Sequence, residues 1–170
     1  MSWPSTSRVR RLGGPVSALV VLCTWTCACG YAPVRGKSAQ GLRVAAVRND
    51  TAQAEAGGIF AAELRRELAG RGRLEPESSG APELLAELVV LRSVPSGVGA
   101  EGGAASYSLT GELRVRAPGF EDAVVGGEDY LTGVDVLGTE ANRRAALRRL
   151  ARTLAAEAIE RYEVNERFSR

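Results

Sequence analysis

Cys29 is the residue of this chain with the most distinctive chemistry, because an apolar run over residues 16–28 ends immediately before it. Arg8, Arg10 and Arg11 precede that run, and no acidic residue accompanies them. A basic start followed by a short apolar stretch is typical of a secretory signal. The run is shorter than the roughly 20 residues that a membrane-spanning helix needs, so we expect export without a permanent transmembrane helix.

Residues 26–29, Thr-Cys-Ala-Cys, resemble the lipobox of bacterial lipoproteins, in which the cysteine becomes the lipid-modified first residue of the mature protein. We therefore predict a cleaved signal peptide over 1–28 and lipidation of Cys29. Two alternatives stay open: cleavage without lipidation, which leaves a free Cys29, and modification of Cys27. Thr26 departs from the leucine that is usual in the motif. Fatty-acid labelling that persists in Cys29→Ser would contradict the prediction.

The chain contains no histidine. This excludes Ser/His/Asp triads, Cys/His dyads and zinc sites of the HExxH type. Chemistry with paired carboxylates, as in glycoside hydrolysis, needs only Asp or Glu, but no such pair stands out. We predict no catalytic residues, no metal site and no cofactor, and hence a protein that is not an enzyme.

The charge balance gives no support for a nucleic-acid partner. The chain has 22 basic and 20 acidic residues, but three of the arginines lie in the signal peptide, which has no acidic residue. The mature part therefore has no basic excess. Residues 29–170 are the size of one ordinary domain, and with Cys29 as their only cysteine they form no internal disulfide.

Hydrophobic periodicity then predicts the elements of that domain. Residues 29–41 lack an apolar period and are predicted as a tether between the lipid and a domain over 42–163. A strand over 42–47 ends at an asparagine turn, and Phe60, Leu64 and Leu68 indicate an amphipathic helix over 54–70. Residues 84–92, nearly all apolar, indicate a central strand that begins near Leu85.

The second half of the domain begins with residues 94–106, whose glycines predict a long mobile loop. That loop is either a tolerated surface insertion or a segment that orders against a partner. Alternation over 107–117 and from Phe120 onward predicts two strands joined as a hairpin. A long helix follows, with Thr139 as its N-cap and Leu147, Leu150 and Leu154 on its apolar stripe, before a C-terminal tail over 164–170.

This element order, β-α-β-β-β-α, favours an α+β fold with two helices packed on one face of a four-stranded, mainly antiparallel sheet. The first strand is a candidate for parallel pairing with a later one. The larger aromatic residues are expected to pack in the core or at an interface rather than to hold a cofactor. They are Tyr107, Phe120, Tyr130 and Tyr162.

The mature chain as a whole resembles the LptE family of lipopolysaccharide-assembly lipoproteins. The segments that carry the resemblance are Cys29-Gly30-Tyr31, residues 42–51, residues 86–91, Tyr107, Tyr130, and the alanine-rich run over 145–159. Each is generic alone, and their order and spacing carry the comparison. The resemblance implies an outer-membrane lipoprotein on the periplasmic face, without catalytic residues, that plugs the β-barrel protein LptD and assists lipopolysaccharide insertion. The alternative is another envelope lipoprotein, such as a peptidoglycan synthase activator or a curli-secretion-like component.

Arg144, Arg148 and Arg152 are the candidate binding residues, because their four-residue spacing forms one row along the last helix. Guanidinium groups in such a row make bidentate contacts to phosphate or carboxylate groups, so the row is a candidate site for lipopolysaccharide or for the partner. The alternative is a solvated basic face whose repulsion is relieved by Glu140 and Glu157.

Overall fold

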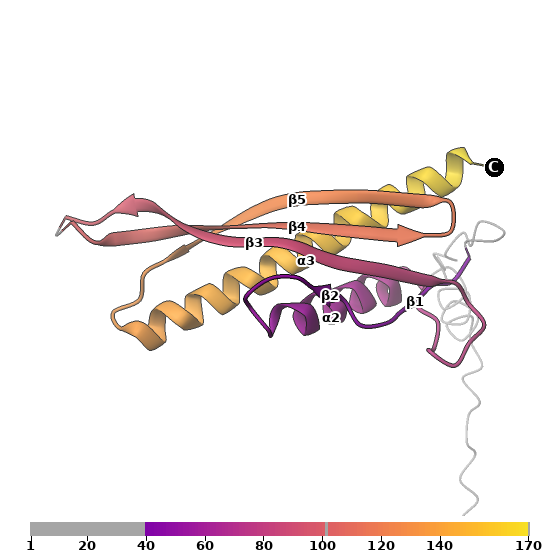
Figure 1. The fold of residues 1–170 in the computed structure, drawn as a ribbon, viewed down its shortest axis with the longest axis horizontal. Coiled ribbons are helices and arrows are strands. Elements are labelled where there is room, and N and C mark those ends of the chain that lie inside the picture. The colour runs from indigo at the N-terminus through magenta and orange to yellow at the C-terminus, as the bar shows by residue number, and fades with distance from the viewer. Residues whose placement is uncertain (1–39, 101, 170) are drawn as a thin grey trace, which may run out of the picture. The chain divides into compact units, whose positions relative to one another are not determined.

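The computed structural model describes residues 40–100 and 102–169. The predicted signal peptide, Cys29 and nearly all of the predicted tether lie outside this part of the chain. The elements, labelled in Figure 1, are β1 (Arg43–Val44), β2 (Arg48–Asn49), α2 (Ala56–Gly70), β3 (Glu83–Val98), β4 (Ala104–Ala117), β5 (Phe120–Leu131) and α3 (Val136–Phe168). None of the described helices carries an apolar stretch long enough to span a membrane.

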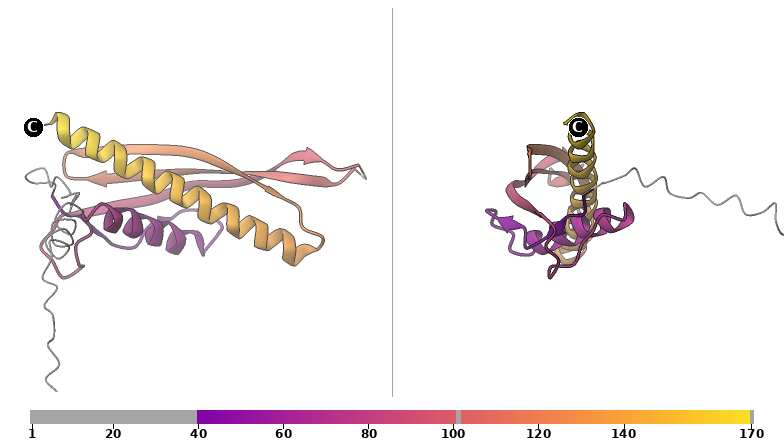
Figure 2. Two further views of the ribbon diagram at one scale, coloured as in Figure 1. Left: turned by 180° about the vertical axis from the view of Figure 1, so that it is seen from behind. Right: turned by 90° about the vertical axis from the view of Figure 1, so that its right-hand side faces the viewer.

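The sheet is mixed and confirms the predicted α+β architecture. β3, β4 and β5 pair antiparallel in that order, and β1 and β2 both pair parallel to the first half of β3. Of the strand predicted over 42–47, only β1 forms as a strand, and it makes the parallel pairing for which that strand was a candidate. β2 lies beyond the predicted strand, where the asparagine turn was expected, and it also pairs parallel with β3. Figure 2 shows that the two helices lie on the same face of the sheet.

The core lies between that face and the helices. Leu109, Leu113 and Val115 alternate along β4 and are fully or almost fully buried, while the residues between them point to the other face. Apolar residues at helical spacing on α2 and α3 complete the core, and all are at most 1% exposed: Phe60, Leu64, Leu68, Leu147, Leu150, Leu154 and Ile159. The four aromatic residues predicted to pack do so, with Tyr130 and Tyr162 buried.

The prediction of a long loop over 94–106 is wrong for most of that segment, because β3 extends to Val98 and β4 begins at Ala104, and the two strands pair as a hairpin. Pro95 pairs with Tyr107 and Val98 with Ala104, with bulges on either side of Gly97. Backbone pairing supplies hydrogen bonds irrespective of side-chain size, so a run of small residues still forms a strand. Pro95 is tolerated because this half of β3 pairs with no described strand other than β4.

Both ends of α3 differ from the sequence prediction. Asp135, not Thr139, is the N-cap, and its carboxylate accepts a hydrogen bond of 2.6 Å from the Gly138 backbone N–H. The Thr139 hydroxyl instead accepts from the Gly133 N–H and donates to the Asp135 carbonyl, which closes the turn before the helix. At the other end the helix runs to Phe168, so most of the segment predicted as a tail is helical.

The described chain begins beside the C-terminal end of α3, where Arg73 is the central contact. Its guanidinium is only 5% exposed and donates hydrogen bonds of 2.7 and 3.3 Å to the Gln40 carbonyl. It also forms ion pairs with Glu166 at 3.0 Å and Glu163 at 3.5 Å, and lies 5.0 Å from the centre of the Tyr162 ring. This cluster fixes the position at which the chain enters the domain.

Candidate functional site

The three predicted arginines lie together on the exposed side of α3. A continuous helix separates residues four apart by about 6 Å along its axis, so Arg144, Arg148 and Arg152 form the expected row. We call these three residues the arginine row. The side chains of Arg144 and Arg152 are 54% and 64% exposed, and Arg148 is also exposed.

Carboxylates of α3, of α2 and of the α2 N-cap partly neutralise the arginine row. Arg144 lies 3.0 Å from Glu140 and 3.7 Å from Glu55, the residue at the N-terminus of α2. Arg152 lies 3.7 Å from Glu63, which is nearly buried and is also held by Arg66 at 2.6 Å. The arginine row therefore runs along the boundary between α2 and α3, and carboxylates lie beside its first and last members, Arg144 and Arg152.

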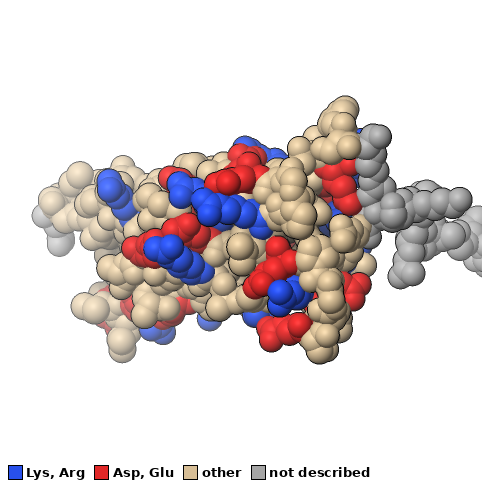
Figure 3. Space-filling model, turned by 45° about the vertical axis from the view of Figure 1, so that its right-hand side comes forward, with Lys and Arg blue, Asp and Glu red and all other residues tan. Residues whose placement is uncertain are grey.

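Arg148, at the centre of the arginine row, forms no hydrogen bond or ion pair within the described part of the chain. Of the two acidic residues expected to relieve the row, Glu140 does so, whereas Glu157 pairs with Arg161 at 2.6 Å. An exposed, unpaired guanidinium retains its hydrogen-bond donors for an incoming anion. Figure 3 shows how basic and acidic side chains otherwise interleave over one face of the domain.

Arg143 and Glu140 form the most tightly coupled pair near the arginine row. Arg143 donates from Nε to Glu140 Oε2 at 2.7 Å and from Nη2 to Oε1 at 2.8 Å. These hydrogen bonds lower the pKa of Glu140, and the nearby charges of Arg143 and Arg144 lower it further. The same contacts raise the pKa of Arg143, against a smaller opposing effect of its burial. Arg143 also donates to Gln53, which links α3 to the segment before α2.

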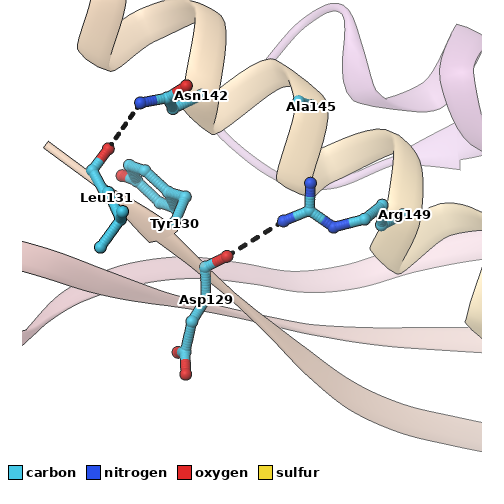
Figure 4. A pocket seen from close by; sticks show the side chains of 6 residues that line it. All are labelled: Asp129, Tyr130, Leu131, Asn142, Ala145 and Arg149. Atoms are coloured by element: carbon cyan, nitrogen blue, oxygen red, sulfur yellow. Dashed lines mark hydrogen bonds between the residues drawn. The ribbon is translucent and has the colours of Figure 1, made fainter. Parts of the chain in front are cut away.

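A groove of about 260 Å³ lies between β5 and α3 (Figure 4). Arg149 Nη2 donates to the Asp129 carbonyl at 3.0 Å, and Asn142 Nδ2 donates to the Leu131 carbonyl at 2.9 Å. These side chains satisfy backbone acceptors at the outer edge of the sheet. Tyr130 forms one wall, stacks on Tyr107 with ring centres 5.3 Å apart, and shares a hydrogen bond of 2.7 Å with Ser93.

Arg149 and Asn142 are not among the binding residues predicted from the sequence. Both lie on the side of α3 that meets β5, and their seven-residue spacing returns to the same helix face after two turns. This seven-residue spacing is the sequence pattern from which the pair could have been predicted to share one face of the helix. Within the described ranges there is also no group of three side chains suited to a metal ion. The chemistry that these two sites offer is hydrogen bonding and ion pairing.

Comparison with protein families identifies the chain. The family model described as LptE, lipopolysaccharide-assembly, matches residues 39–162, the whole of the described domain up to the last turns of α3. The chain belongs to the LptE family. This confirms the resemblance carried by the sequence, and it assigns the chain to a lipopolysaccharide-assembly family. No curated protein matches the chain.

Solved structures resemble this chain at low sequence identity. A DUF330 protein from Xanthomonas campestris superposes with a TM-score of 0.56 at 12% identity, over 81% of this chain and 91% of that one. Rare lipoprotein B from Shewanella oneidensis gives a TM-score of 0.49 at 17% identity, over 74% of this chain and 98% of its own. The first of these likenesses supports the α+β architecture of two helices on one mixed sheet.

Proposed function

We propose that this LptE-family lipoprotein is anchored by a lipid on Cys29 to the periplasmic face of the outer membrane. There it associates with an LptD-like β-barrel, binds lipopolysaccharide and assists its insertion at the cell surface. Its work is binding and assembly, without catalysis. The observation that carries the proposal is the family match over residues 39–162, because it spans the domain and not one generic motif.

The position at which the chain enters the domain supports the proposed lipid anchor. The Gln40 N–H lies 3.4 Å from Glu166, and the Gln40 carbonyl is held by Arg73. About ten residues separate Gln40 from Cys29, and an extended chain of that length spans at most about 36 Å. A lipid on Cys29 would therefore hold this end of α3 near the membrane surface. Fatty-acid labelling of the chain and of Cys29→Ser tests the assignment.

The arginine row supports the binding half. The guanidinium groups of the arginine row are only partly neutralised, so they can bind further anions. The anions that we propose are phosphate groups of lipopolysaccharide or carboxylates in a barrel lumen. Arg148 is the member best placed to bind, because Arg144 and Arg152 first have to leave Glu140 and Glu63. We expect single substitution of Arg148 to account for most of the effect of substituting all three.

The first experiment on the proposal is affinity purification of the tagged, full-length lipoprotein from detergent-solubilised outer membranes, with identification of the proteins that accompany it. A large β-barrel in stoichiometric amount is the expected result. Recovery of a peptidoglycan synthase or of a curli-secretion component, with no barrel, would favour the alternative envelope functions and contradict the proposal.

The second experiment measures lipopolysaccharide binding and barrel recovery for Arg148→Glu and for the triple substitution of the arginine row by Glu. The matched control is Arg92→Glu, because Arg92 is also exposed and has no partner within the described residues but lies on β3. We expect roughly tenfold weaker binding in both row variants, the loss of about 1.4 kcal/mol that one charge-assisted contact contributes. Unchanged binding and recovery in folded row variants would refute the role of the row.

A further inference from the structure

The groove between β5 and α3 lies beside the unpaired arginine of the arginine row. Ala145 lines the groove, and Arg148 follows it by three residues on α3. Residues three apart are neighbours on a helix surface, with Cβ atoms about 5–6 Å apart. Ala145 is exposed and carries only a methyl group, so it leaves the guanidinium of Arg148 room to reach the rim of the groove. The groove and this cation therefore adjoin on α3.

The charged groups on the wall of the groove are already neutralised. Arg149 donates from Nε to Glu128 at 2.9 Å and from Nη2 to the Asp129 carbonyl at 3.0 Å. The Asp129 carboxylate points away from the groove, as Figure 4 shows. Glu140 on α3 is already paired with two arginines. We therefore expect the anionic part of a ligand at Arg148 and an uncharged part in the groove.

Several hydrogen-bonding groups of the groove have no partner within the described part of the chain. β5 pairs with β4 alone among the described strands, so its other edge is open. The carbonyls of Asp129 and Leu131 face α3, where they accept from Arg149 and Asn142. In an antiparallel strand the N–H of a residue points the same way as its carbonyl, so these two residues also direct their N–H groups to the groove. Both N–H groups and Nη1 of Arg149 are free donors, and Oδ1 of Asn142 is a free acceptor.

These free groups favour a hydroxylated ligand over a hydrocarbon chain. A hydrocarbon that covers N–H donors removes their water without replacing the hydrogen bonds, which costs free energy for each covered group. A hydroxyl both donates and accepts, so the hydroxyls of a sugar match the donors and the acceptor of the groove. Tyr130 supplies a flat wall that its stacking on Tyr107 holds in place. The volume of about 260 Å³ lies just below the roughly 300–1,000 Å³ of sites for drug-sized ligands, so the groove suits a single sugar ring.

We propose that the groove and Arg148 together bind a phosphorylated sugar, with the sugar ring in the groove and the phosphate on the guanidinium. The inference rests on the proposed function, because its ligand is the phosphorylated sugar portion of lipopolysaccharide. This portion, and not an acyl chain, is what α3 and β5 recognise. The sugar and the phosphate have to be joined for full affinity, because each alone meets only one part of the site.

The test measures binding of deacylated lipopolysaccharide, a phosphorylated oligosaccharide, to the full-length lipoprotein in detergent by titration calorimetry. Inorganic phosphate and phosphatidylglycerol in the same detergent are the comparison ligands. We expect deacylated lipopolysaccharide to bind at least about tenfold more tightly than either of them, and Arg148→Glu to remove most of that advantage. No binding of deacylated lipopolysaccharide, or equally tight binding of phosphatidylglycerol, would overturn the inference.

Two variants of the groove, each with a matched control on α3, test the part played by the sugar. Ala145→Leu fills the groove, whereas Ala141→Leu changes an exposed alanine one turn earlier that does not line it. Asn142→Ala removes the amide of the groove, whereas Asn165→Ala removes an amide that donates to the Gly119 carbonyl at 3.2 Å near the other end of α3. We expect about fivefold weaker binding of deacylated lipopolysaccharide in the two groove variants alone. Binding of inorganic phosphate should be the same in all four variants.

These measurements separate the inference from the proposed function. If the unaltered lipoprotein recovers no barrel and binds no intact lipopolysaccharide, the proposed function fails, and the inference fails with it. If intact lipopolysaccharide binds, but the two groove variants bind the deacylated form as tightly as their controls do, the proposed function stands and the site for a phosphorylated sugar is refuted.

Discussion

Replacement of Arg73 by methionine tests whether the buried cluster at the start of the domain stabilises the fold. The substitution keeps most of the length of the side chain but removes every hydrogen bond and ion pair of the guanidinium. The Gln40 carbonyl would lose a bond of 2.7 Å, and the carboxylates of Glu163 and Glu166 would lose a nearby cation.

The expected loss of unfolding free energy depends on how deeply the carboxylates that contact Arg73 are buried. Loss of one partner of a buried ion pair costs about 3–5 kcal/mol, because it leaves the other charge without compensation. The side chains of Glu163 and Glu166 are about one fifth exposed, and Glu163 keeps Arg71 at 2.7 Å, so the lower end of that range applies. We expect the free energy of unfolding to fall by about 3 kcal/mol.

Urea unfolding of a lipid-free chain, followed by circular dichroism, measures this loss. With a denaturant slope of about 2 kcal/mol/M, the midpoint should fall by about 1.5 M. The matched control is Arg116→Met, because Arg116 pairs with Glu121 at 2.8 Å while both side chains are more than half exposed, and such surface pairs contribute less than about 1 kcal/mol. If the two variants lose the same stability, the cluster is no stronger than a surface ion pair and the reasoning is refuted.

Two further predictions concern α2 and the start of α3. Gly58→Ala should raise the free energy of unfolding by about 0.5–1 kcal/mol, because Gly58 lies in a helix and its Cβ would meet nothing within 4 Å. Gly57→Ala should give no such gain in the same thermal or urea assay, since its Cβ would lie 3.1 Å from the Val47 carbonyl oxygen. For Glu140, hydrogen bonds from Arg143 lower the pKa in the folded state, so its contribution to stability is present above the ordinary value of 4.5 and is lost as pH falls through the lowered pKa. The stability difference between the unaltered chain and Glu140→Gln should therefore shrink from pH 7 to pH 3, and a difference independent of pH would contradict the assigned ion pair.

The errors in the sequence predictions have particular physical causes. Residues 94–106 have no hydrophobic period, and only pairing across the hairpin places residues 94–98 and 104–106 in strands. Asp135 and Thr139 are both good N-cap residues, and the choice between them depends on the turn at Gly133, where the backbone of Gly138 leaves no room for a side chain. Glu157 pairs with Arg161, which also binds Asp122 on β5, a neighbour that helical spacing alone does not reveal.

What the sequence by itself determined were the properties that depend on local spacing: the periodic apolar stripes of α2 and α3, the alternation of β4, the arginine row and the motif at Cys29. Side chains at fixed intervals share a helix or strand face wherever that element lies, so these inferences need no knowledge of the fold. Only the tertiary structure decided which charges meet, because Glu63 reaches Arg152, and Arg73 reaches Glu166, across long sequence separations.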